Sequence, residues 1–265
     1  MKKSTLKKLS ETNYNFYQTA GMFWNPSENY FWQGWSKLLP HIRNLELKIK
    51  SEKLKVLDLG CGNGRFANFL KQHFVNTEIE YTGLDSSDFL LTQAEAKKQQ
   101  NFAKFEILKT DFLFDNWPEQ VKDGEFDLVV AFGLLHHIPG YQNRLKILEN
   151  ARNLLDKNGL LILTTWQYLD VERLRKRVVS AEKRIQILNK LGIQGSELET
   201  GDNFLNWVKL VESIRFSHYF SPEELQKLLL DLKMNLIEKY QDDGRTGNVN
   251  GYFVLGELSS LGFIG

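Results

Sequence analysis

Short apolar runs alternate with amphipathic stretches from about residue 54 to residue 166. Buried β-strands are predicted at 54–59, 78–84, 103–108, 126–132 and 160–165. Helices are predicted between them at 63–74, at 88–99 with Asp88 as the N-cap, and at 141–155. The run FDLVVAF at 126–132 is apolar at almost every position, which is typical of a strand covered on both faces. This alternation predicts right-handed crossovers and a parallel sheet.

The rhythm changes after Thr165. Apolar residues spaced alternately by three and four predict one amphipathic helix over 171–190, and 191–215 looks irregular. Ser221 is a good N-cap and Pro222 suits the first helical position, so a helix is expected from there to about Lys233. Two short strands separated by the turn-rich DDGRTGN predict a terminal β-hairpin, with its strands at about 235–240 and 250–257.

We therefore expect four segments along the chain. An N-terminal helical arm covers 1–50 and a core covers 51–166. An insertion follows at 167–215, and the helix and β-hairpin of 216–265 complete the core.

The composition is that of an ordinary soluble globular protein. Hydrophobic residues make up 42% of the chain, charged residues make up 25%, and the net charge is +1. No apolar run approaches the roughly 18 residues that a membrane helix needs. The basic N-terminus has no apolar segment behind it, which argues against a secretory signal. Cys61 is the single cysteine, so no internal disulfide can form and a cytoplasmic location is expected.

A glycine-rich loop is the strongest chemical signal. The segment VLDLGCGNG (56–64) places Gly60, Gly62 and Gly64 directly between a strand and a helix, where missing Cβ atoms let a ligand lie against the backbone. Dinucleotide-binding loops have the spacing G-x-G-x-x-G, whereas here the third glycine comes one residue earlier. Asp58 precedes the loop and would repel a pyrophosphate, so it suits a ligand that carries an ammonium group.

Two further acids follow the next two strands. Asp85 ends the second strand, where a carboxylate can accept both hydroxyls of a ribose, although it could also cap a helix. Asp111 follows the third strand and could accept from an adenine amino group with Phe112 against the ring, although a plain loop acid is the alternative.

Together with FDLVVAFGLLHHIPG and LLDKNGLLILTTW, these motifs resemble the class I S-adenosylmethionine-dependent methyltransferases over residues 54–166. The resemblance implies an α/β fold: a Rossmann-like, seven-stranded, mostly parallel sheet with helices on both faces and the last strand antiparallel. It implies S-adenosylmethionine as cofactor, bound at the carboxyl ends of the strands of 51–166, with the insertion on the substrate side. The cofactor-binding residues that it implies are Asp58, Gly60, Cys61, Gly62, Gly64, Asp85, Ser86, Asp111, Phe112, Phe132 and Gly133.

A narrower resemblance is to the tRNA wobble-uridine carboxymethyl methyltransferases. It is carried by His136, His137, Arg144 and Trp166, and by the segments GDNF with Trp207 and RFSHYF (215–220). The stretch from Tyr14 to Pro26 is a looser match that lacks an expected arginine. The resemblance implies a carboxymethyl uridine in the tRNA anticodon as substrate and its methyl ester as product. The resembling eukaryotic enzymes use a small activating subunit, and no feature of this sequence indicates whether this chain uses one.

Such a substrate sets clear chemical demands. A carboxylate has no proton to lose, so it needs alignment and charge-assisted hydrogen bonds, which Arg144, Arg215, Arg245 or His218 could supply. The two adjacent histidines either line the wall or touch the substrate as base or donor. The residues expected at the reaction are therefore His136, His137, Arg144, Arg215 and His218. An unpaired base would stack on aromatic rings, for which the candidates are Trp24, Trp166, Trp207 and Tyr219. No metal is indicated.

The segment 171–190 carries seven basic residues against two acidic ones. Such runs are commonly solvated helix faces, but this one could contact tRNA phosphates together with the lysine-rich N-terminus. The residues in question are Lys2, Lys3, Arg173, Arg175, Lys176 and Arg177.

Two other functions remain open at this stage. One is a small-molecule O-, N- or C-methyltransferase with an apolar lid and a histidine base. The other is a catalytically silent scaffold that binds the cofactor or another protein. The intact glycines and the acids Asp58, Asp85 and Asp111 argue against the silent scaffold.

Overall fold

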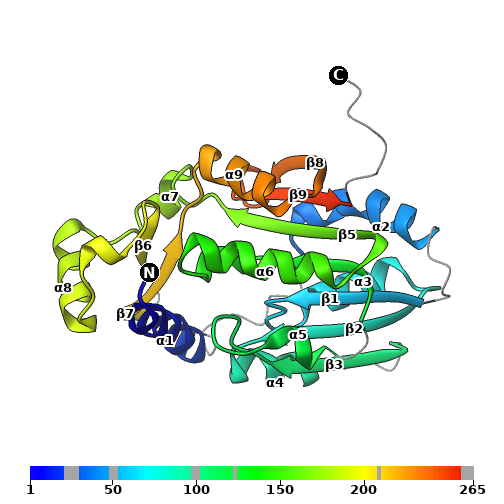
Figure 1. Ribbon diagram of the computed structural model, residues 1–265, viewed down its shortest axis with the longest axis horizontal. Coiled ribbons are helices and arrows are strands. Elements are labelled where there is room, and N and C mark those ends of the chain that lie inside the picture. The colour runs from blue at the N-terminus through cyan, green and yellow to red at the C-terminus, as the bar shows by residue number, and fades with distance from the viewer. Residues whose placement is uncertain (21–29, 48–52, 97–101, 122–123, 208–209, 258–265) are drawn as a thin grey trace.

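The computed structural model describes residues 1–20, 30–47, 53–96, 102–121, 124–207 and 210–257. A seven-stranded sheet forms the centre of the molecule, with the strand order β3-β2-β1-β4-β5-β9-β8 (Figure 1). Its strands are β1 (Lys53–Leu59), β2 (Glu78–Asp85), β3 (Lys104–Lys109), β4 (Phe126–Ala131), β5 (Leu155–Trp166), β8 (Asn235–Asp242) and β9 (Asn250–Gly256).

The strand directions confirm the predicted fold class. The pairs β1–β2, β1–β4, β2–β3 and β4–β5 are parallel, with Asp58 beside Val130 of β4. The last strand, β9, runs antiparallel to both β5 and β8. The reversal of strand order between β1 and β4 opens a crevice at their carboxyl ends, where open α/β sheets bind ligands.

Helices cover both faces of the sheet, and two apolar clusters fill the layers between them. One cluster joins Leu57, Val129 and Leu161 to the helices α6 (Tyr141–Asn153) and α9 (Pro222–Leu232). The other joins Val56, Leu128 and Ile162 to helices on the opposite face, which are η2 (Gln33–Leu38), α2 (Leu39–Glu46), α3 (Arg65–His73) and α4 (Asp88–Ala96). Because neighbouring residues of a strand point to opposite faces, the apolar run of β4 supplies both layers.

The insertion differs from its prediction. The expected helix over 171–190 is two helices, α7 (Glu172–Arg175) and α8 (Ala181–Leu191). The break has two causes: Val179 N donates to Phe204 O (3.0 Å), and the Ser180 side chain caps a new helix by accepting from Lys183 N. The stretch expected to be irregular holds η4 (Gly195–Glu197) and an antiparallel pair, β6 (Asp202–Trp207) and β7 (Leu210–His218).

The N-terminal helix α1 (Lys3–Ala20) lies against β7 (Figure 1). Its Leu9 is fully buried in a small apolar cluster with Phe204 and Phe216 of the β6–β7 pair. The helix and the insertion thus form one wall over the carboxyl ends of the core strands. The division of the chain into the segments 1–50, 51–166, 167–215 and 216–265 stays a prediction.

Short elements complete the description. They are α5 (Trp117–Gln120) and η3 (Leu135–His137). Ser221 caps α9 as predicted, by accepting from Glu224 N. At α4 the prediction is off by one residue, because the helix begins at Asp88 and Ser87 Oγ accepts from Leu90 N (3.4 Å). Among the described residues, no helix is long and apolar enough to cross a membrane.

Candidate active site

The glycine loop bends tightly away from β1. Gly60, Gly62 and Gly64 have φ values of +79°, +54° and +75°, a region that side chains with a Cβ rarely adopt. Gly60 N and Cys61 N both donate to Leu84 O, at 2.8 and 3.0 Å, and so fix the loop to the end of β2. The loop leads directly into α3, whose first backbone N–H groups have no partner within the helix. The backbone is therefore shaped to lie against a ligand.

Two buried carboxyl groups flank the loop. Asp58 at the end of β1 accepts a hydrogen bond from Tyr81 OH at 2.5 Å. Burial raises the pKa of Asp58 to about 7, the Tyr81 hydrogen bond opposes this shift, and the charge of Asp85 adds to it. Asp85 accepts from Gly62 N and Ser87 N, each at 2.9 Å, and burial raises its pKa as well. A ligand with an ammonium group would restore the charge on Asp58 that burial disfavours.

The third acid is already partly occupied. Asp111 accepts from Leu113 N (2.9 Å) in its own loop and from Ser10 Oγ of α1 (3.2 Å). Phe112 packs edge-on against Trp117 with ring centroids 5.9 Å apart. Asp111 and Phe112 both border a cavity at the carboxyl ends of the core strands, so an adenine ring between them is compatible with the structure.

A cavity of about 700 Å³ opens at the carboxyl ends of β1, β2, β4 and β5. Its volume lies in the range of small-molecule and cofactor sites. Ten of the eleven residues expected to bind the cofactor line it, namely Asp58, Gly60, Cys61, Gly62, Asp85, Ser86, Asp111, Phe112, Phe132 and Gly133. Gly64 is not among the lining residues; it precedes α3 and closes the turn through Gly64 N to Cys61 O (3.0 Å).

The same cavity continues to the wall formed by α1 and the insertion. There Arg215 of β7 is held between two aromatic rings, with its Cζ 4.4 Å from the ring centroid of Trp166 and 5.2 Å from that of Phe16. Its Nη1 donates to Tyr17 OH at 3.5 Å. Trp207 also borders the cavity, with its ring 5.5 Å from Phe16. A cation and several flat apolar rings thus face the cofactor half of the cavity.

Both histidines of η3 line the cavity and are neutral. Tyr17 OH lies 2.6 Å from His137 Nε2, and His137 Nδ1 lies 3.3 Å from Phe216 O. Burial, followed by repulsion from Arg215, lowers the pKa of His137 to about 3. Burial, followed by repulsion from His137 and Arg215, also lowers the pKa of His136 far below its usual value. Buried His136 Nδ1 has no hydrogen-bond partner among the described residues, so a ligand would find a free polar atom there.

Arg144 and His218 do not border the cavity, in contrast to the sequence expectation. The Arg144 side chain is fully buried, and its Nη2 donates to Glu199 Oε2 and Glu224 Oε1, each at 2.7 Å. His218 Nδ1 lies 2.7 Å from Asp202 Oδ1, and its Nε2 lies 2.8 Å from Glu224 Oε2. Burial lowers the pKa of His218, but the hydrogen bonds to the two carboxylates raise it more. These groups join α6 and α9 to the insertion rather than face a substrate.

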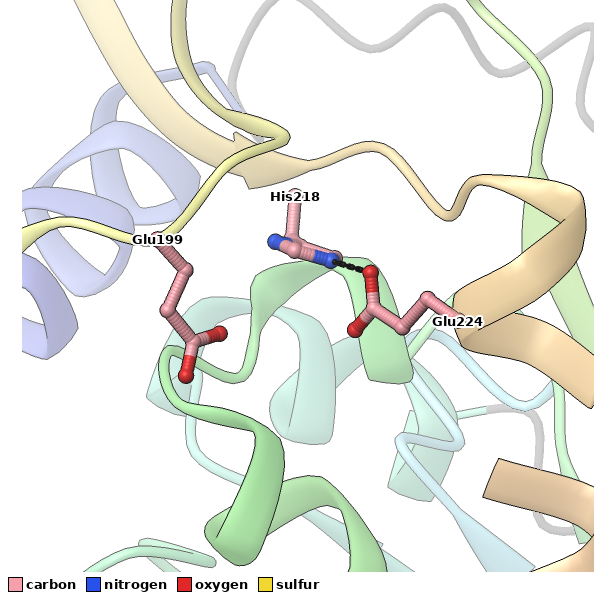
Figure 2. A group of neighbouring side chains, drawn as sticks. All are labelled: Glu199, His218 and Glu224. Carbon is pink, nitrogen blue, oxygen red and sulfur yellow. Dashed lines mark hydrogen bonds and ion pairs between the residues drawn. The ribbon is translucent and has the colours of Figure 1, made fainter. Parts of the chain in front are cut away.

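Figure 2 shows Glu199, His218 and Glu224 as neighbours, with a hydrogen bond between His218 and Glu224. One potential metal-ligand atom of each residue lies within 4.8 Å of the others. However, the guanidinium of Arg144 bonds to both glutamates. A metal ion would have to displace this buried cation or bear its repulsion. We therefore interpret the group as a buried charge network.

Several lining residues were not predicted. Tyr17 and Asp243 carry no sequence signal of their own, because Tyr17 lies in a loosely matched segment and Asp243 in a turn. Asp243 holds the N-terminal arm to the core: its Oδ1 accepts from Gly34 N (3.0 Å) and its Oδ2 from Tyr252 OH (2.5 Å). Of the other aromatic candidates, Tyr219 donates to Asp170 Oδ1 (2.8 Å) outside the cavity lining.

Two residues named in the sequence analysis, Trp24 and Pro26, lie outside the described residues. Arg245 is not among the residues that line the cavity. Within the basic run, Arg173 and Arg177 line the cavity, whereas Arg175 and Lys176 are exposed and do not.

Comparisons with known proteins agree with this geometry. The profile of a family described as "Methyltransferase domain" matches residues 50–210. The ubiquinone biosynthesis O-methyltransferase of Glaesserella parasuis is 29% identical over 160 residues, which are 57% of this chain and 61% of that protein. The Bos taurus protein named "Probable tRNA methyltransferase 9B" is 26% identical over 137 residues, 52% of this chain and 26% of that protein.

Among solved structures, magnesium protoporphyrin IX methyltransferase from Synechocystis PCC 6803, with bound S-adenosylmethionine, has a TM-score of 0.55 at 14% identity. The match covers 97% of this chain and 98% of that one, and it shows the same fold. The family match extends over more than half of the chain and includes the glycine loop, Asp58, Asp85 and the cavity-lining histidines. The chain therefore belongs to the methyltransferase domain family and is an S-adenosylmethionine-dependent methyltransferase of class I.

Proposed function

We propose that this methyltransferase transfers the methyl group to the carboxylate of a carboxymethyl uridine in a tRNA anticodon and forms the methyl ester. The observation that carries the proposal is Arg215. Its guanidinium faces the cavity, stacks on Trp166, and forms no ion pair with a carboxylate of the described residues. An arginine held in place by two rings and left without a counter-charge is suited to receive an anionic substrate.

The residues that line the cavity match the demands of this reaction. When S-adenosylmethionine is bound, its positive sulfur would carry the methyl group, and one carboxylate oxygen of the acceptor would form the new C–O bond as the S–C bond breaks and S-adenosylhomocysteine leaves. No proton leaves the carboxylate, so the reaction needs no base, which agrees with histidines whose pKa burial holds far below the usual range. Arg215 would align the acceptor, and its contacts with Trp166 and Tyr17 limit how tightly it can grip a charge that disappears in the transition state.

Aromatic rings around Arg215 suit a flat, unpaired base. Trp166, Trp207 and Phe16 border this half of the cavity, and single-stranded RNA bases are commonly bound by such stacking. The similarity to a protein named as a tRNA methyltransferase supports the same substrate class. The wider phosphate contacts of Lys2, Lys3, Arg175 and Lys176 stay a prediction.

A second candidate is methylation of a small-molecule hydroxyl group. It is favoured by His136 Nδ1, which lies in a residue that lines the cavity, has no partner among the described residues, and could receive a hydrogen bond from a hydroxyl group. The similarity to ubiquinone biosynthesis O-methyltransferases points in the same direction. The two candidates differ in what they need, since a hydroxyl group requires a base and a carboxylate requires Arg215.

Mass spectrometry of nucleosides from tRNA incubated with the protein and S-adenosylmethionine tests the proposal. We expect a product one methyl group heavier that alkaline hydrolysis returns to the carboxymethyl nucleoside. Arg215→Ala should abolish this product while binding S-adenosylhomocysteine as the wild type does. Product that resists alkali, or methyl transfer by Arg215→Ala at the wild-type rate, would contradict the proposal.

A further inference from the structure

Two arginines of the basic segment 171–190 line the cavity, whereas their neighbours Arg175 and Lys176 are exposed and do not. Arg173 lies on α7 and Arg177 in the turn that follows, four residues apart and therefore on the same side of the turn. The backbone of Arg177 is fixed to the β6–β7 pair, because Asn206 N donates to Arg177 O at 2.8 Å. Arg173 and Arg177 both line the cavity, whereas their neighbour Arg175 does not. Their placement is thus set by the fold.

These arginines share their space with Arg215. Burial lowers the pKa of Arg177, and the positive charges of Arg215 and Arg173 lower it further, so both of these guanidinium groups lie near enough to Arg177 to repel it. None of the three forms an ion pair with a carboxylate in the part of the chain that the structure describes. Three cations around one cavity, without acidic partners, carry an unfavourable repulsion that an anionic ligand would relieve.

The three arginines Arg173, Arg177 and Arg215 differ in their surroundings and in their exposure to solvent. Arg215 lies against Trp166 at the end of β5, on the cofactor side. Arg173 is exposed, whereas Arg177 and Arg215 are both half-buried, so this group of lining arginines reaches solvent at Arg173. Paired guanidinium groups provide several donors in fixed planes, which is the arrangement that binds phosphate oxygens in proteins.

We propose that Arg173 and Arg177 form a phosphate site for the same nucleotide whose base enters the cavity, while Arg215 receives that base's carboxylate. The inference rests on the proposed function and deepens it: the substrate is recognised as a phosphate-bearing nucleotide, not as a free nucleoside. The site differs from diffuse contacts of the basic run, because it uses only the two arginines that line the cavity.

A mononucleotide tests this phosphate site alone, because it lacks the other phosphates of a tRNA that could contact the protein surface. Calorimetry would compare binding of carboxymethyluridine with that of its 5′- and 3′-monophosphates, in the presence of S-adenosylhomocysteine. We expect one of the monophosphates to bind about tenfold or more tightly than the nucleoside. The variant R173A/R177A should lose that preference. The matched variant R175A/K176A removes the same charge from the same segment and should keep the preference.

Each outcome decides between the claims. Equal binding of nucleoside and monophosphates, no binding of any of them, or the same loss of preference in both variants overturns the phosphate site. Methyl ester formation is measured in parallel. Esterification of the nucleoside without a phosphate preference overturns the phosphate site and leaves the proposed function standing. A phosphate preference that depends on Arg173 and Arg177, without any methyl ester, supports the site and contradicts the proposed function.

Discussion

Arg144 offers a sharp test of the structure, because family resemblance assigns it to the reaction and the structure assigns it to the fold. Its side chain has no exposed surface, and it donates to Glu199, to Glu224 and, through Nη1, to Ile138 O (3.0 Å). Arg144→Met keeps most of the apolar stem and removes the charge. Two carboxylates then lose their shared cation, and one backbone oxygen loses its donor.

The expected loss of stability follows from the burial of these partners. Removing one member of a buried ion pair costs about 3–5 kcal/mol, because the remaining charge stays in a poor environment. In the folded protein the side chains of Glu199 and Glu224 are 34% and 19% exposed to solvent. Water therefore screens part of the destabilisation by the unpaired carboxylates. We therefore expect the lower end, about 3 kcal/mol, which corresponds to a fall in Tm of about 10 °C for a chain of this size.

Urea unfolding and calorimetry of Arg144→Met measure this loss directly. The double variant R144M/E224Q should recover part of it, since one of the stranded charges is gone and the two changes are not additive. Affinity for S-adenosylhomocysteine should stay at the wild-type value, because Arg144 does not line the cavity. A variant as stable as the wild type that binds the cofactor product but transfers no methyl group would refute this reasoning and restore Arg144 to the substrate site.

Two other predictions follow from the cofactor half of the cavity and its walls. Because the pKa of Asp58 is raised to about 7, lowering the pH through that value protonates the carboxylate and should weaken S-adenosylmethionine binding; Tyr81→Phe, which removes an opposing hydrogen bond, should move the loss to higher pH. Calorimetry from pH 5.5 to 8 checks this, and a flat affinity would contradict it. A Cβ on Gly34 would lie 2.5 Å from ring atoms of Tyr252, so Gly34→Ala should cost about 1–3 kcal/mol in urea unfolding by displacing η2. An unchanged unfolding midpoint would show that the arm is not docked this way.

The core could be predicted from sequence because its signals are local. Each strand of the parallel sheet is a short apolar run, and β4 is buried at all six positions, as the pattern FDLVVA indicates. The glycine loop is equally local, since the positive φ of Gly60 and Gly62 needs residues without a Cβ. The cofactor site therefore follows from residues that lie close together in the chain.

The insertion could not be predicted in the same way. The apolar spacing of 171–190 continues through the break, and the helix stops there because Val178 pairs with Leu205 on a later strand and Ser180 caps a new helix. In β6 the apolar residues Phe204 and Leu205 are adjacent and follow two polar residues, so the strand lacks the two-residue alternation that marks a half-buried strand. Tertiary pairing overrides the local pattern here.

Side-chain direction was the other missing information. Resemblance identifies residue types at positions, but it does not show whether Arg144 points into the cavity or into the layer between α6, α9 and the insertion. Arg215 and His218 belong to one strand, β7, yet Arg215 lines the cavity and His218 lies in the buried network. They are three residues apart in the strand, so their side chains point to opposite faces, and this separation requires knowing that 210–218 is a strand and not an irregular stretch.

In the proposed function, one cavity holds both the cofactor and an anionic acceptor, at opposite ends. The most direct measurement is a crystal structure of the protein with S-adenosylhomocysteine and carboxymethyluridine monophosphate. It should show the amino group of the cofactor product beside Asp58, its ribose at Asp85, and the carboxylate of the nucleotide on Arg215. A nucleotide bound elsewhere, or a cofactor product whose ribose or amino group contacts Arg215 instead, would contradict the assignment.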